Sequence, residues 1–133
     1  MPEKQPIIAL EGLRVTVDRV VYSPNPEGPE GQPHRFIYFI TIHNDSAETV
    51  TIKARKWVVT DDRGQTVVVE GDGVVGQFPK LEPGEHFSYN SMHLLGTRKG
   101  RAEGSYFGLD DQGRRVLTRI PAFDLEVPED DGE

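Results

Sequence analysis

The pattern of apolar and polar positions predicts β-strands from one end of the chain to the other. Residues 13–22 alternate between apolar and polar side chains, which is the period of a strand with one buried face. Residues 35–45 are apolar on both parities, as is typical of a central strand. Further runs rich in β-branched and aromatic residues follow at 49–60, 65–70, 86–95, 103–109, 114–120 and 122–127. No run shows a sustained helical period.

The strand that contains the lone tryptophan changes parity along its length. Val50, Ile52 and Ala54 lie on one parity, whereas Trp57 and Val59 lie on the other. A strand that keeps one buried face cannot change parity without an extra residue, so we predict a β-bulge near Arg55–Lys56. Because Trp57 shares its parity with Val59, the tryptophan is predicted to belong to the core.

Turn signals separate these runs at regular intervals. Residues 61–64 and 110–113 are near copies, in which Asp starts a turn and Gly supplies a positive φ, so both are predicted to be hairpin connections. Residues 81–85 predict a tight turn, and residues 23–34, with four prolines and two glycines, predict a long open loop. Short strands with frequent turns predict an all-β fold, an antiparallel β-sandwich of about seven to nine strands.

The chain reads as one domain. The sandwich is predicted to span residues 13–127, with an N-terminal segment at 1–12 before it and an acidic, disordered tail at 128–133 after it. The N-terminus has no apolar run long enough for a secretion signal or a membrane span, so we expect a cytoplasmic protein that does not bind membranes.

Charge and composition exclude several classes of function. The chain has 15 basic and 22 acidic residues, a formal charge of −7, and five of the acids lie in the last eight residues. Without these last eight residues, the positive and negative charges of the chain are nearly balanced. This balance argues against nucleic-acid binding, because that needs a net basic face. Cysteine is absent, which excludes disulfides, thiolate metal sites and cysteine nucleophiles.

Residues 70–79, EGDGVVGQFP, contain the pattern G-x-G-x-x-G after a strand-like run. In a dinucleotide-binding fold the last glycine of this pattern enters a helix whose N-terminus faces the phosphates. Here two prolines and a glycine follow Gly76 within eight residues and exclude such a helix. One remaining interpretation is an anion-binding nest of backbone N–H groups. The other is a structural loop that packs three apolar side chains onto the sandwich, namely Val74, Val75 and Phe78.

The candidate anion site combines this loop with nearby bases, which would bind a phosphate or pyrophosphate. Its residues are Gly71, Asp72, Gly73, Val74, Val75 and Gly76 from the loop, with Lys56, Arg98 and Lys99 as the bases. Such a site requires the fold to bring the bases to the loop. The alternative role for the bases is to protect a solvent-facing strand from pairing with other chains.

The sequence carries no catalytic or metal-ligating pattern, so we expect no enzyme, no cofactor and no metal site. The four histidines are His34, His43, His86 and His93, and no H-x-H or H-x-x-x-H spacing occurs. The paired acids are explained by the two hairpin turns, and no serine lies in a G-x-S-x-G pattern. The least favoured alternative, an enzyme, would need a pocket that holds His86 or His93 with two carboxylates.

Several motifs together resemble the ApaG domain family. In the family's order they are the tryptophan-centred strand 55–60, the D-x-x-G hairpin 61–64, the glycine loop 69–79, L-x-P-G-E at 81–85, G-S-Y at 104–106 and I-P-x-F-x-L at 120–125. The likeness covers residues 13–127. The chain departs from the family at residues 94–100, where P-L-x-T-P-x-G is more usual, and in the longer, proline-rich loop 23–34.

The resemblance implies a fibronectin-type-III-like β-sandwich in a mostly non-enzymatic family. It also implies a loose association with resistance to cobalt and magnesium, a protein-interaction role, and phosphate or pyrophosphate binding at the glycine loop. The leading hypothesis is therefore a protein-binding module that binds an unidentified protein or self-associates. Anion binding is the alternative. Both departures from the family lie in loops, which is where partners of a sandwich bind.

Overall fold

The structure, a computed structural model, describes residues 6–25, 28 and 31–129, which form nine strands and no helix. The strands are β1 (Ile8–Ala9), β2 (Leu13–Pro24), β3 (His34–Asn44), β4 (Val50–Asp61), β5 (Thr66–Asp72), β6 (Lys80–Leu81), β7 (His86–Leu95), β8 (Lys99–Asp110) and β9 (Arg115–Glu126). The prediction of an all-β sandwich is confirmed. No helix long and apolar enough to cross a membrane occurs in the described part of the chain.

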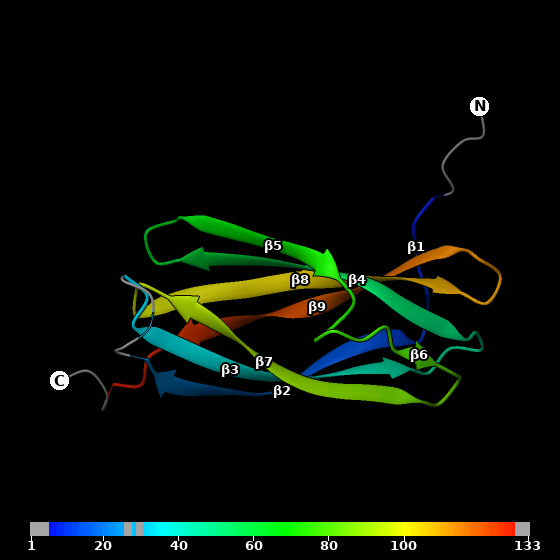
Figure 1. Ribbon diagram of the computed structural model, residues 1–133, viewed down its shortest axis with the longest axis horizontal. Coiled ribbons are helices and arrows are strands. Elements are labelled where there is room, and N and C mark those ends of the chain that lie inside the picture. The colour runs from blue at the N-terminus through cyan, green and yellow to red at the C-terminus, as the bar shows by residue number, and fades with distance from the viewer. Residues whose placement is uncertain (1–5, 26–27, 29–30, 130–133) are drawn as a thin grey trace.

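Two sheets pack face to face (Figure 1). Sheet A has the order β1-β9-β8-β4-β5, with β6 also paired to β4, and sheet B has the order β2-β3-β7. The pairs are antiparallel except β1 with β9, where Ile8 and Ala9 lie parallel to Val116 and Leu117. Sheet A thus includes part of the predicted N-terminal segment 1–12, of which residues 1–5 lie outside the description. Most of the predicted tail 128–133 also lies outside it, at 130–133.

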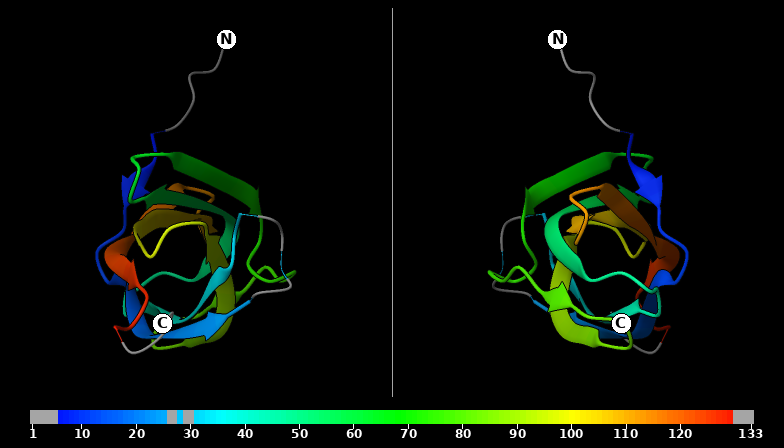
Figure 2. Two further views of the ribbon diagram at one scale, coloured as in Figure 1. Left: turned by 90° about the vertical axis from the view of Figure 1, so that its left-hand side faces the viewer. Right: turned by 90° about the vertical axis from the view of Figure 1, so that its right-hand side faces the viewer.

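The two sheets face each other in the end-on views (Figure 2), and the buried apolar side chains form one core cluster between them. The central strand β3 contributes alternate side chains that are almost fully buried, and Trp57 of β4 is 2% exposed, so its assignment to the core is confirmed. Trp57 packs against Tyr38, with 4.8 Å between the ring centroids.

The β-bulge in β4 exists, but it lies earlier than the sequence prediction placed it. The register against β8 shifts between Ile52 and Ala54, which makes Lys53 the extra residue. The prediction near Arg55–Lys56 is therefore wrong by two or three positions. The error arose from Ala54, because its small apolar side chain has the same parity as Val50 and Ile52 in the sequence and so extended the predicted first face. As a result Arg55, opposite Tyr106 in the register, shares the core-facing parity of Trp57.

Both predicted D-x-x-G hairpins are confirmed, and both use the same hydrogen bonds. Oδ1 of Asp61 accepts from the N–H groups of residues 63 and 65, and Oδ1 of Asp110 accepts from those of residues 112 and 114. Gly64 and Gly113 take φ values of 81° and 77°, which explains the glycine at each position.

The last strand is longer than the sequence indicated. The predicted runs 114–120 and 122–127 form the single strand β9, which passes through Pro121. A register shift against β8 between Ala102 and Gly104 accommodates the proline, which has no N–H to offer to a neighbouring strand.

Candidate functional site

The glycine loop makes a tight turn whose backbone groups are largely engaged. Gly73 N–H donates to the carbonyl of Lys53 at 2.7 Å, and Val74 and Gln77 exchange hydrogen bonds of 2.8 and 2.9 Å. Between them Val75 and Gly76 have φ values of 43° and 78°, as in a two-residue type I′ turn. Three of the amides around this turn therefore already have backbone partners.

The packing of the loop bears out the structural interpretation only in part. Val74 is fully buried, as that interpretation predicted. Val75 and Phe78 are 48% and 54% exposed, so their predicted packing onto the sandwich is wrong. Phe78 instead lies under the ammonium group of Lys53, 5.8 Å from the centre of the ring.

The side chain of Arg55 hydrogen-bonds to the backbone of the loop. Its Nη1 donates to the carbonyl oxygens of Asp72 and Gly73 at 2.9 and 3.1 Å. A Cβ placed on Gly71 would lie 2.8 Å from the guanidinium carbon, so the glycine leaves the room in which Arg55 lies. The signal in the sequence was the shared parity of Arg55 and Trp57. It was missed because the bulge was placed too late.

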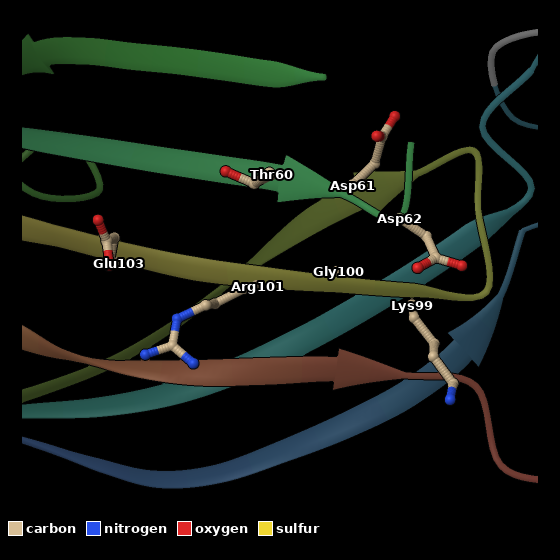
Figure 3. A pocket seen from close by; sticks show the side chains of 7 residues that line it. All are labelled: Thr60, Asp61, Asp62, Lys99, Gly100, Arg101 and Glu103. Carbon is tan, nitrogen blue, oxygen red and sulfur yellow. The ribbon is translucent and has the colours of Figure 1, made fainter. Parts of the chain in front are cut away.

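Of the three predicted bases, Lys56 lies beside the start of the loop and the other two are remote from it. Lys56 is opposite Glu70 in the register, on the outer face of sheet A, and its Nζ is 3.6 Å from the carboxylate of Glu70. Arg98 and Lys99 lie by the 61–64 hairpin, at the end of β4 remote from the loop, since Asp61 pairs with Gly100. Figure 3 shows Lys99 there, beside a shallow pocket lined by Asp61 and Asp62. The fold does not bring Arg98 and Lys99 to the glycine loop, and anion binding by that loop stays a prediction.

His93 is a half-buried histidine whose ring lies against the aromatic side chains of the core. Its ring stacks on Tyr38 with centroids 4.7 Å apart and meets the edge of Trp57 at 4.6 Å. Burial lowers the pKa of His93 to about 4. Within the described part of the chain its buried Nε2 has no hydrogen-bond partner. The site thus favours the neutral ring, because nothing compensates the desolvation of a charged one.

The enzyme alternative finds little support around these histidines. His86 is exposed at the start of β7, beside His43. Among the described residues that line the groove containing His93, Asp61 is the single acid. Across residues 6–25, 28 and 31–129, no group of three or more His, Cys, Asp or Glu side chains is arranged to hold a metal ion.

The strand β5, at one edge of sheet A, exposes a row of apolar side chains. In the part of the chain that the structure describes, β5 pairs with β4 alone. Val67, Val68 and Val69 are 57%, 53% and 42% exposed. We call residues 66–70 the β5 edge. The sequence did not reveal it, because a run that is apolar on both parities is typical of a central strand.

A groove of about 430 Å³ runs between β5 and the end of β7, which is one of the two outer strands of sheet B. Val67 and Val69 contribute to it from the core-facing side of β5, where they oppose Val59 and Trp57. Met92, His93 and Leu94 line it from β7. The end-on views show β5 and β7 as the outer strands on one side of the sandwich (Figure 2). An edge strand and a groove with valines on its β5 side therefore adjoin each other, and Asp61, Arg63 and Gln65 line the hairpin end of the groove.

Comparison with known proteins agrees with the sequence motifs. The family profile described as the ApaG domain matches residues 24–109. The chain is 40% identical over 121 residues to Protein ApaG of Vibrio cholerae, which covers 91% of this chain and 95% of that protein. It is 37% identical over 116 residues to Protein ApaG of Methylococcus capsulatus, with coverages of 87% and 91%.

Solved structures match most of the chain. The X-ray structure of a structural genomics target superposes with a TM-score of 0.81 and 32% identity, covering 89% of each chain. A crystal structure of a Bordetella pertussis protein gives a TM-score of 0.80 and 31% identity, covering 93% of this chain and 99% of that one. Since the profile, the relatives and the fold agree over most of its length, the chain belongs to the ApaG domain family.

Proposed function

We propose that this chain is a non-enzymatic protein-binding module that binds through the β5 edge. The observation that carries the proposal is the row of three consecutive exposed valines on the outer strand of a sheet. An edge strand presents N–H and C=O groups that pair readily with another chain, and proteins usually blunt such edges with lysine or proline. Residues 66–70 contain neither.

The groove beside this edge supports the same function. In strand addition, main-chain hydrogen bonds give affinity, and pockets for alternate side chains give specificity. The groove receives Val67 and Val69 on one side and Met92 on the other, so it is mainly apolar at the point where an added strand would lie. We also propose that the protein is cytoplasmic, as its N-terminal sequence led us to expect, and that it has the association with cobalt and magnesium resistance that the family resemblance implies.

Affinity capture with matched baits tests the proposal. Immobilised wild-type chain and a Val68→Lys variant are compared with Leu109→Lys, which introduces the same charge at an exposed apolar strand position outside the β5 edge. We expect proteins retained by the wild type and Leu109→Lys to be lost from Val68→Lys. Equal retention by all three baits contradicts the use of this edge.

Anion binding at the glycine loop is the second candidate, and Arg55 is the observation that favours it. Its guanidinium brings positive charge to the carbonyl oxygens of residues 72 and 73. A titration of ¹⁵N-labelled chain with pyrophosphate, followed by NMR, tests this candidate. Shifts confined to residues 70–78 that disappear in Arg55→Gln support it. If no chemical shift changes up to millimolar pyrophosphate, anion binding at the loop is contradicted.

A further inference from the structure

We propose that the partner bound at the β5 edge is a second copy of this chain, whose β5 pairs antiparallel with the first about Val68. The inference rests on the proposed function, because it names the occupant of the same edge. Homo-oligomers are most often two-fold symmetric, and such an interface must be complementary to itself. The β5 edge meets this requirement in its side-chain pattern, its charges and the position of the groove.

The side-chain pattern selects a single register. A two-fold axis normal to the sheet keeps each face of β5 on its own side, so directly opposed residues must have the same parity. Centred on Val68, the pairing sets Val68 opposite Val68 and Val67 opposite Val69 of the second copy. With the centre at residue 67, one valine faces a valine and the other two face Thr66 and Gln65. With the centre at residue 69, the other two face Glu70 and Gly71. Only the centre at Val68 pairs all three valines with valines, which covers the most apolar area across the two strands.

The charges at the two ends of the strand favour the same antiparallel arrangement. Arg63 lies in the turn before β5, and Glu70 and Asp72 lie at its end. The same turn contains Asp61, whose carboxylate accepts hydrogen bonds from N–H groups within the turn, and Asp62, which lines a pocket with Lys99. In the antiparallel pair Arg63 of each copy lies beside Asp72 of the other. This complementarity occurs twice because of the symmetry. A parallel pairing would instead bring like charges together.

The groove gives the second copy a further surface to cover. Both copies keep sheet B on the same side of the joined sheet, so the two grooves face each other beneath the paired β5 strands. Val67 and Val69 of each copy then lie over a shared apolar space that Met92 borders. Exposed apolar area on β5 and β7 becomes covered in the dimer, which supplies the driving force for association.

Sedimentation equilibrium over a concentration series from micromolar to millimolar tests the dimer. We expect the full wild-type chain to form a dimer and Leu109→Lys to behave like it. In Val68→Lys two like charges face each other at the axis, which should raise the dissociation constant at least about 100-fold. Met92→Lys places the charge on the other edge strand and should weaken the dimer less. Circular dichroism checks that each variant is folded.

A cysteine scan tests the register. The chain has no cysteine, so a single introduced thiol can form a disulfide only with the same thiol of a second copy. With Val68→Cys the two thiols meet at the axis, where opposed Cα atoms about 4.5–5.5 Å apart suit a disulfide. With Thr66→Cys the thiols are offset by four residues, roughly 13 Å along the strand. On mild oxidation we expect a covalent dimer from Val68→Cys and none from Thr66→Cys.

The outcomes separate this inference from the proposed function. A wild-type chain that stays monomeric at all concentrations overturns the inference. If Val68→Lys still loses captured proteins in that case, the β5 edge binds a different protein and the proposed function stands. A dimer that Val68→Lys leaves intact, or equal cross-linking of the two cysteine variants, also overturns the inference, because the interface then lies elsewhere.

Discussion

At the scale of single residues, His93 links the packing of the core to pH. Its pKa is about 4 in the folded chain, because burial disfavours the charged imidazole, and the ordinary value is 6.5. The folded pKa is depressed, so the unfolded chain takes up the proton first as pH falls. The stability that the neutral ring preserves is therefore complete above pH 6.5 and is lost between pH 6.5 and about 4.

We expect the free energy of unfolding to fall by about 3 kcal/mol across this window, since one pKa unit corresponds to about 1.4 kcal/mol. Urea unfolding at several pH values between the two limits measures the fall. His93→Phe keeps a ring between Tyr38 and Trp57 and should remove most of the pH dependence. His86→Phe, at the exposed start of the same strand, should preserve it. An unchanged slope in His93→Phe contradicts the assignment.

Val75 carries a different local cost. Its φ of 43° lies in the left-handed region, which costs an L-residue roughly 1–2 kcal/mol and is especially unfavourable for a β-branched side chain. Asn followed by Gly is the preferred sequence for a type I′ turn. Because the valine is 48% exposed, little buried area is lost when it is replaced.

Val75→Asn should therefore raise the free energy of unfolding by about 1 kcal/mol. Chemical denaturation of the two proteins at the same concentration provides the measurement. A variant that is less stable than the wild type would mean that Val75 makes contacts that outweigh the strain.

At the scale of secondary-structure elements, Asn44 joins the end of β3 to the turn before β4 and to β6. It is fully buried, and its Nδ2 donates to the carbonyl oxygens of Glu48 and Leu81 at 2.7 and 2.9 Å. Its Oδ1 accepts from the backbone N–H and from the hydroxyl of Ser46. Asn44→Ala should cost about 3 kcal/mol or more, because several buried polar groups lose their partners at once.

Thermal and urea unfolding of Asn44→Ala measure this cost. Asn90→Ala, at an exposed position of β7, is the matched control and should change stability by less than about 0.5 kcal/mol. If both variants lose the same small amount, the network around Asn44 does not hold the two elements together.

The elements could be predicted from the sequence where the information is local. Alternation along residues 13–22 and the Asp and Gly positions of 61–64 are sufficient for a strand and a hairpin, and both are present. The order of strands in a sheet depends on long-range packing, so the exposure of Val67–Val69 could not be read from their apolar pattern. The position of Arg55 required the exact site of the bulge, which the small side chain of Ala54 concealed.

At the scale of the whole molecule, self-association would couple folding to concentration. A dimer of folded chains stabilises the folded state by mass action, so the melting temperature should rise with protein concentration. We expect such a rise for the wild type and for Leu109→Lys, and a constant melting temperature for Val68→Lys. Differential scanning calorimetry over a concentration series checks this. Parallel behaviour of all three proteins contradicts the coupling.

The two edges of sheet A differ in a way that limits the size of any assembly. At the far edge from β5, β1 covers the start of β9, and Pro121 interrupts the donors of the same strand further along. A chain with two adhesive edges polymerises into filaments, whereas a chain with one adhesive edge stops after a single pairing. The short parallel pairing of Ile8 and Ala9 thus protects part of this edge from pairing with another chain. In the proposed dimer the two ends of the joined sheet are these protected edges, which favours a closed pair over a fibre.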